Sequence, residues 1–339
     1  MRDRAFVLMR GPAGAILIAL ALGSIAMWIA GSDPFEGFSS LLYGALGSPT
    51  GIAETLVQTT ALLFPALAVT IAFRAGLFNI GAEGQLIIGG LACGAIGAVF
   101  SAPAIVAIPI LLAAGAAGGA AWGAIAGWLR ARFGASEVIS TIMLNILAGL
   151  LAQYLLTSIL RSGGGSGNET GPLPSEAWLP VLLPDSRLTI AILIAAALAL
   201  ALRWMLARTV FGFELRAAGE APQVARRSGV ALERMSIQVM ALSGACAGIG
   251  GATIVMGVLH RFNVALSPGY GFIAIAVALV GNLDPLYVIV ASFGFGILQS
   301  GALSMQSVAH VPKDVIAAVE GILVFILAAQ RYVLSKAKA

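Results

Sequence analysis

Residues 208–235 read RTVFGFELRAAGEAPQVARRSGVALERM, a basic stretch with five arginines and three glutamates in a chain that is otherwise largely apolar. The stretch carries the signals that start and stop a helix. Pro222 suits a first helical position, Arg226 and Arg227 fall in the last turn, and Gly229 stands where a left-handed residue ends a helix. The pattern predicts a short helix of about seven residues, acidic at its start and basic at its end. We expect such a helix to dock a partner; an ordinary basic connection is the alternative.

The rest of the chain has the composition of a membrane protein. Hydrophobic residues make up 59% of it and charged residues 10%, against about 25% charged residues in a soluble domain. Apolar runs that could cross a hydrocarbon core of ~30 Å recur along the sequence. They predict an all-α polytopic protein with about ten transmembrane helices, the third and eighth of them short, in a single domain over residues 1–339. The helices are expected at about 14–31, 52–73, 84–100, 103–129, 138–160, 188–207, 236–259, 269–283, 286–306 and 313–332.

The arginines and lysines indicate how these helices are oriented. With the N-terminus inside, four of the 19 basic residues fall on the outer side, namely Arg161, Arg187, Arg261 and Lys313. Because cytoplasmic loops carry the excess of basic residues, both termini and the loop at about 208–235 are expected in the cytoplasm. The loop at about 161–187 is then expected outside. The formal net charge of +4 fits the anionic surface of a lipid bilayer, and nothing in it indicates a nucleic-acid partner.

Several chemical functions lack their sequence signals. Cys93 and Cys246 lie in predicted membrane helices without CxxC or histidine spacing, so we expect packing residues and neither a metal nor a redox site. The glycine-rich segment 163–171, GGGSGNETG, lacks the GK[ST] ending of a phosphate-binding loop and is interpreted as a flexible linker. The chain is therefore expected to have no nucleotide site and no cofactor of its own. His260 and His310 are its only histidines, and neither HExxH nor GxSxG occurs, so an enzyme is not indicated.

Glycines recur at every fourth position in the predicted helix at 103–129, which gives three overlapping GxxxG steps. The four residues are Gly115, Gly119, Gly123 and Gly127. In lipid, such rows let helix backbones approach closely and pack by dispersion. We interpret this helix as a central packing element or as a helix at a subunit interface.

Polar residues gather where the second and third predicted helices meet. Residues 73–90, FRAGLFNIGAEGQLIIGG, hold Asn79, Glu83 and Gln85 among several glycines, a density that favours broken or re-entrant backbone. Asn145 adds an amide to the fifth helix. Polar groups in a membrane are costly unless they pair or line a cavity, so these four residues are candidates for a substrate path. Caps at helix ends are the alternative. No helix centre carries the acidic cluster typical of proton- or sodium-coupled carriers, so energy is expected from elsewhere, or the protein is a passive channel.

Three segments together resemble a known family. In order and spacing, FRAGLFNIGAEGQ, AAGEAPQVARRSGV and GYGFIAIAVALVGNLDP are similar to the permease subunits of bacterial ABC importers for ribose, nucleosides and branched-chain amino acids. The likeness is strongest to the longer nucleoside-type permease and covers residues from about 50 to 335. It implies a type II importer permease fold with inverted halves, in the bacterial cytoplasmic (inner) membrane.

The resemblance also implies a function and partners. The chain would be the permease of an ATP-driven importer of a small polar solute, a nucleoside or a simple sugar, working by alternating access. Its partners would be two ABC ATPase subunits, which use the ATP, a second permease of different sequence and an extracytoplasmic substrate-binding protein. The predicted short helix would couple to the ATPase through Arg216, Gly219, Glu220, Pro222, Arg226, Arg227 and Gly229. A stand-alone secondary carrier or facilitator is the alternative, although such a carrier has no reason to present a docking helix.

Overall fold

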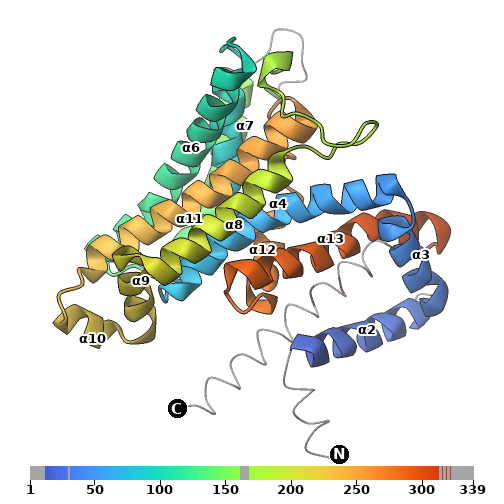
Figure 1. Ribbon diagram of the computed structural model, residues 1–339, viewed down its shortest axis with the longest axis horizontal. Coiled ribbons are helices and arrows are strands. Elements are labelled where there is room, and N and C mark those ends of the chain that lie inside the picture. The colour runs from blue at the N-terminus through green and yellow to red at the C-terminus, as the bar shows by residue number, and fades with distance from the viewer. Residues whose placement is uncertain are drawn as a thin grey trace, which may run out of the picture.

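The computed structural model describes residues 12–29, 31–160 and 168–312, together with residues 315, 318 and 321. Over these residues the regular secondary structure is helical, apart from two isolated β-bridges (Figure 1). The elements are α2 (Pro12–Ile29), α3 (Pro34–Leu46), α4 (Pro49–Arg74), α5 (Ala82–Gly97), α6 (Ala104–Phe133), α7 (Glu137–Ser158), the 3-10 turn η1 (Ser175–Ala177), α8 (Ala191–Arg208), α9 (Val210–Glu220), α10 (Pro222–Arg227), α11 (Leu232–Ile254), the π-helical turn η2 (Val255–Leu259), α12 (Tyr270–Val280) and α13 (Pro285–Val308).

Six described helices are long and apolar enough to cross a membrane. They are α4, α6, α7, α8, the continuous α11–η2 helix and α13. Three shorter apolar helical stretches are Leu20–Ile29 of α2, α5 and α12, and the sequence predicts that the third and eighth helices, here α5 and α12, are short. The prediction of an all-α polytopic membrane protein is therefore confirmed. The tenth predicted helix, at 313–332, lies outside the described residues except at positions 315, 318 and 321.

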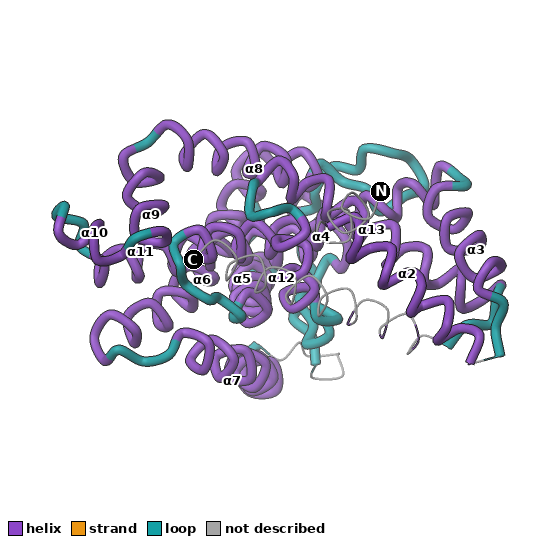
Figure 2. Tube along the Cα trace, turned by 90° about the horizontal axis from the view of Figure 1, so that it is seen from below, coloured by secondary structure: helices purple, strands orange, loops and turns teal. Residues whose placement is uncertain are grey.

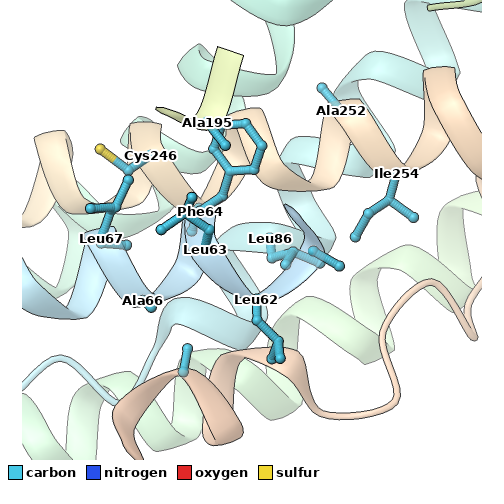
Figure 3. Close-up of a cluster of buried hydrophobic side chains, with 14 of the residues drawn as sticks. Leu62, Leu63, Phe64, Ala66, Leu67, Leu86, Ala195, Cys246, Ala252 and Ile254 are labelled. Atoms are coloured by element: carbon cyan, nitrogen blue, oxygen red, sulfur yellow. The ribbon is translucent and has the colours of Figure 1, made fainter. Parts of the chain in front are cut away.

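The centre of the bundle is formed by α4 and α11. Both are buried over most of their length, whereas most residues of α6, α7 and α8 are half-buried or exposed. A helix that is apolar on all sides suits either the interior of the bundle or a surface that faces lipid. Figure 3 shows the core between the two helices, with Phe64 and Leu67 of α4 near Cys246 of α11 and Ala195 of α8. Seen from below, α9 and α10 lie at one side of the bundle, and α2 and α3 at the other (Figure 2).

The same succession of elements occurs twice in the chain. The long buried α4 leads through residues 75–81 to the short α5, and the long buried α11 leads through residues 260–269 to the short α12. The two short helices also begin close together, because the Gly271 N–H donates to the Glu83 carboxylate at 2.7 Å. Both connecting segments interrupt the helical path, and the glycine density at 73–90 predicts such a break for the first of them.

One helix that the sequence analysis did not predict is α3. Its start is well marked, because Asp33 Oδ1 accepts from the Phe35 N–H at 2.8 Å and Pro34 takes the first turn. The helix packs against α13, where Leu41 lies beside Gly301. A search for apolar runs that can cross a membrane passes over it, since its 13 residues are too few to span the bilayer.

The basic stretch at 208–235 contains two helices rather than one. Thr209 caps α9 by accepting from the Gly212 N–H at 3.0 Å, and α9 continues to Glu220. The predicted acidic start of the short helix is therefore wrong, because Glu220 ends α9 and α10 has no acidic residue in its first turn. The chain changes direction at Ala221, which lies between the two helices with extended-like backbone.

The described part of the glycine-rich segment, residues 168–171, is more tightly held than a flexible linker. Residues 163–167 lie outside the described residues, but Glu169 forms a β-bridge with Asn263 and an ion pair of 2.7 Å with Arg261. Further along the same loop, Trp178 stacks on His260 with ring centroids 3.8 Å apart. The interpretation of 168–171 as a linker is corrected by these contacts, which join the loop to the turn after η2. Sequence patterns alone do not reveal such long-range partners.

Candidate functional site

The short helix α10 starts and stops where the sequence predicts. Pro222 occupies its first position, and Gly229 follows its end with φ 92°. The Gly229 N–H donates to the Arg226 carbonyl at 3.1 Å, and the Val230 N–H donates to the Ala225 carbonyl at 3.0 Å. This pair of bonds is the Schellman arrangement, which closes a helix and fixes the direction of the chain that leaves it. The helix therefore has a defined length and orientation despite its six residues.

Most of α10 faces away from the bundle. Val224 is 62% exposed, and Arg226 and Arg227 are exposed as well, whereas Ala225 is buried. Arg226 forms an ion pair of 2.5 Å with Glu233, at the start of α11. Because both partners are largely exposed, this pair adds little to stability. The exposed face thus combines an apolar side chain with two guanidinium groups, a combination suited to a protein partner.

Gly219 connects this surface to the central helix α4. A Cβ atom at Gly219 would overlap the carbonyl oxygen of Arg74, at the last residue of α4. On the other side of the contact, Gly76 has φ 73°, and a Cβ there would lie 3.2 Å from the Gly219 Cα. Backbone therefore meets backbone, with no side chain between them. A displacement of α9 towards α4 would press directly on the backbone at the end of α4, because no flexible side chain lies in the contact.

The end of α4 is in turn tied to the turn between α12 and α13. Arg74 Nε donates to the Leu283 carbonyl at 2.7 Å, and Leu283 lies in the left-handed region with φ 54°. Next to it, both carboxylate oxygens of Asp284 accept from Arg203 of α8, at 2.8 and 3.0 Å. Arg216 of α9 borders the same small pocket as Arg74, Arg203 and Asp284. We call this end of the bundle, which carries α9 and α10, the α10 end.

Asn79 and Gln85, two candidates for the substrate path, bind to each other and to α11. Asn79 Nδ2 donates to Gln85 Oε1 at 3.0 Å and to Ser243 Oγ at 2.8 Å, and Asn79 Oδ1 accepts from the Gly81 N–H at 2.8 Å. Ser243 Oγ donates onward to the Ala68 carbonyl at 2.6 Å. The amides are thereby satisfied within the protein, and they hold the broken backbone between α4 and α5.

The other two candidates, Asn145 and Glu83, also bind backbone. Asn145 of α7 accepts from the Gly84 N–H at 2.8 Å and donates to the Ile80 carbonyl at 2.9 Å. Glu83 accepts from the Gly271 N–H, so its carboxylate lies at the N-terminal ends of both α5 and α12. Helix N-termini carry partial positive charge, which stabilises a buried carboxylate. Three of the four predicted side chains therefore bind at the break between α4 and α5, and that of Glu83 binds the start of α12.

A cavity of about 270 Å³ lies towards the opposite end of the bundle. It is bordered by α4, the segment before α8, the end of α11 with η2, and the loop that leads into α12. Its polar lining includes Glu54, Gln58, Arg187 and Tyr270, none of which the sequence identified as a candidate for a solute path. A signal was present for two of them, because Glu54 and Gln58 stand one helical turn apart in an otherwise apolar run. The four predicted path residues are not among those that line this cavity.

The four glycines of α6 lie against α11. Cβ atoms at Gly119 and Gly123 would overlap the carbonyl oxygens of Gly244 and Met240, and a Cβ at Gly115 would lie 2.6 Å from the Ala252 Cβ. At Gly127, a Cβ would lie 2.7 Å from the carbonyl oxygen of Ser236 in α11. The two backbones thus run in contact over about four turns, as small residues allow in lipid.

The sequence matches known transport proteins over most of its length. The family described as branched-chain amino acid transport system / permease component matches residues 51–328. The guanosine ABC transporter permease protein of Bacillus subtilis is 35% identical over 96% of this chain and 96% of its own length. The nucleoside ABC transporter permease protein of Lactococcus lactis is 32% identical over 97% of this chain and 93% of its own. The glucose ABC transporter permease protein of Haloferax volcanii is 31% identical, over 93% and 86% respectively.

Proposed function

The chain belongs to the family of branched-chain amino acid transport system permease components and is the permease subunit of an ABC importer, and we propose that it moves nucleosides or simple sugars across the membrane. The solute class is supported by the relatives named for guanosine, nucleoside and glucose transport. ATP would be hydrolysed by two partner ATPase subunits, and the chain itself would bind neither nucleotide nor cofactor. The chain would act as a mechanical link between the ATPase and the solute path.

The observation that carries this proposal is the exposed α10 together with its neighbour α9, whose Gly219 meets the end of α4 backbone to backbone. An ATPase that binds Val224, Arg226 and Arg227 would move α10 and α9 together. Gly219 would pass the movement to the end of α4, and Arg74 would pass it to the turn at Leu283. Packed helices respond to such displacements by switching between discrete arrangements, which is what alternating access requires. The structure of α9 and α10 would depend on the remaining predicted coupling residues, Arg216, Glu220, Pro222 and Gly229.

The proposal includes an orientation and further partners. The α10 end carries Arg74, Arg130 and Arg132 besides the arginines of α9 and α10, so the positive-inside rule favours a cytoplasmic position for it. Both termini would then be cytoplasmic, in a bacterial inner membrane. A second permease of different sequence and an extracytoplasmic binding protein would complete the importer. The rival function, a stand-alone carrier or facilitator, leaves the docking surface of α10 without a use.

Reversing the charges on α10 tests the proposal. In the Arg226→Glu, Arg227→Glu variant the backbone of α10 is spared, but an acidic docking groove would be repelled. We expect the tagged variant to insert at the parental level, to lose copurification of the ATPase, and to lose ATP-driven uptake of guanosine or glucose in proteoliposomes. Arg234→Glu is the matched control, because Arg234 is exposed in the same stretch but lies outside α10. Parental uptake by the double variant would favour the stand-alone carrier.

A further inference from the structure

A continuous chain of polar contacts crosses the wall of the 270 Å³ cavity. Tyr270 Oη donates to Gln58 Oε1 at 2.9 Å, and Gln58 Nε2 donates to Glu54 Oε1 at 2.9 Å. The other oxygen of Glu54 forms an ion pair of 2.9 Å with Arg187. These four residues come from three separate parts of the chain, namely α4, the segment before α8 and the start of α12. The contacts therefore join elements that border the cavity on different sides.

The charges of this network cancel within the cavity. Glu54 is the carboxylate and Arg187 is the guanidinium, so their pairing leaves the lining close to neutral. Arg187 has 59% of its side chain exposed, which places it at the mouth, whereas the Glu54 side chain is 24% exposed. A neutral polar cavity disfavours charged solutes, which would lose their hydration without gaining a counter-charge.

The network and its neighbours still offer hydrogen bonds to a solute. Thr60 and Thr253, which also line the cavity, donate their hydroxyl protons to carbonyls of their own helices at 2.7 and 2.8 Å. Each of these hydroxyl oxygens keeps lone pairs that can accept. Gln58 keeps a second amide proton and Arg187 keeps several, so donors and acceptors alternate around the cavity. Alternating groups of this kind suit sugar hydroxyls, each of which donates and accepts.

Apolar residues complete the lining, including Ala61, Ile254 and Leu266. A sugar ring has an apolar face as well as hydroxyls, so the apolar lining residues can pack against the ring while the polar ones bind the hydroxyls. The volume is slightly below the ~300–1,000 Å³ typical of ligand pockets, which favours a small solute or one part of a larger one.

We propose that this cavity binds the hydroxyl-bearing part of an uncharged solute, a free sugar or the ribose of a nucleoside. Glu54, Gln58, Arg187 and Tyr270 would exchange contacts among themselves for contacts with the solute hydroxyls. Since the same contacts join α4 to the start of α12, solute binding and the relative position of these helices would be linked. The inference rests on the proposed function for its class of solute, but not for the site itself.

Protection of an introduced thiol tests the site directly. In a variant that lacks Cys93 and Cys246, Val57→Cys places a thiol in the lining, next to Gln58. Ile52→Cys is the matched control, because Ile52 lies on the same helix, is exposed and is not part of the lining. The complex, purified from its own cells, is treated with a membrane-impermeant maleimide while guanosine, 2′,3′-dideoxyguanosine or D-glucose is present at millimolar concentration.

We expect guanosine or glucose to slow labelling of the Val57→Cys variant several-fold and to leave the Ile52→Cys variant unchanged. Dideoxyguanosine, which retains the base but lacks two ribose hydroxyls, should protect less than guanosine. Adding Gln58→Leu should abolish protection, and Tyr270→Phe, which removes one hydroxyl and keeps the ring, should weaken it. Absence of protection by both hydroxylated solutes, or equal protection by the dideoxy analogue, would overturn the proposal.

ATP-driven uptake by the same complex separates this inference from the proposed function. Uptake without protection would reject the cavity as the solute site and leave the permease role intact. Protection without ATP-driven uptake would retain the site and reject the coupled function.

Discussion

The Asn79 amide is bonded on both sides, with Gln85 and Ser243 accepting from its nitrogen and Gly81 donating to its oxygen. The sequence identifies Asn79 as an unusual polar residue in a glycine-rich break, because apolar runs of this length seldom contain one. Its partner Ser243 stands 164 residues further along the chain, and no local pattern indicates that contact. A polar residue in a membrane helix is thus predictable as important, whereas its role depends on which helix packs beside it.

Removing the Asn79 amide should therefore affect folding. Asn79→Leu leaves the Gly81 N–H and the Gln85 amide without a partner in the interior, and each unsatisfied group costs about 1–3 kcal/mol. We expect a lower yield of folded protein and a lower melting temperature in detergent. Gln153→Leu is the control, because that amide bonds to Asn168 at an exposed position. If Asn79→Leu melted like the parent but lost uptake, Asn79 would belong to the solute path instead.

Among the elements, the close packing of α6 is the feature that the sequence indicates most directly, although its partner α11 is known only from the structure. A glycine at every fourth position predicts a helix that approaches another backbone closely, and the four glycines of α6 do lie along α11. The helix α10 could be predicted equally well from the sequence, because Pro222 and Gly229 mark its two ends. By contrast, α3 and α9 were missed, since each is too short to register as a membrane-crossing run and α9 is also more polar. Local signals predict an element well when its ends are marked, and poorly when only length and hydropathy are considered.

Two glycine-to-alanine substitutions, one inside the α6–α11 contact and one outside it, should have opposite effects on stability. Gly119→Ala introduces a Cβ that overlaps the Gly244 carbonyl, and overpacking of this kind typically costs about 1–3 kcal/mol. In Gly149→Ala, on α7, the new Cβ meets no described atom within 4 Å, and the gain in helix propensity should amount to roughly 0.5–1 kcal/mol. Thermal unfolding in detergent should show a lower midpoint for the first and an equal or higher one for the second. A midpoint at or above the parental value for Gly119→Ala would contradict the tight contact.

Over the whole molecule, the two regions to which we assign functions lie at opposite ends of the bundle. The α10 end holds the exposed face of α10 and the arginine-rich helix ends, and the 270 Å³ cavity lies towards the other end, near Arg187. Between them runs α4, which borders the cavity through Glu54 and Gln58 and contacts Gly219 at its last residue. A single buried helix thus connects the place where energy would enter with the place where solute would bind. The count of basic residues predicts the orientation of this axis, but it gives no indication of the cavity.

The orientation predicts which end is accessible from outside the cell. In a variant without Cys93 and Cys246, we expect an impermeant maleimide to label Pro184→Cys in intact cells and to label Gln223→Cys only after the membrane is permeabilised. Both positions are exposed, so access alone should decide the result. Labelling of Gln223→Cys in intact cells would mean that α10 cannot meet a cytoplasmic ATPase.

The central claim is that α10 must be a rigid helix for transport to be coupled to ATP. Ala225 is the first residue of α10 whose N–H is bonded within the helix, to the Ala221 carbonyl at 2.9 Å. Ala225→Pro removes that bond and adds a ring clash, at a cost of ~3 kcal/mol or more to the helix. Gln223→Pro is the matched control, because proline is tolerated in a first helical turn.

Solute uptake per ATP hydrolysed, measured in proteoliposomes containing the complete importer, tests this claim most directly. We expect Ala225→Pro to lose uptake while the melting temperature of the membrane bundle stays at the parental value, and Gln223→Pro to keep the parental ratio. An Ala225→Pro importer that still moves solute at the parental ratio would show that α10 does not couple ATP hydrolysis to transport.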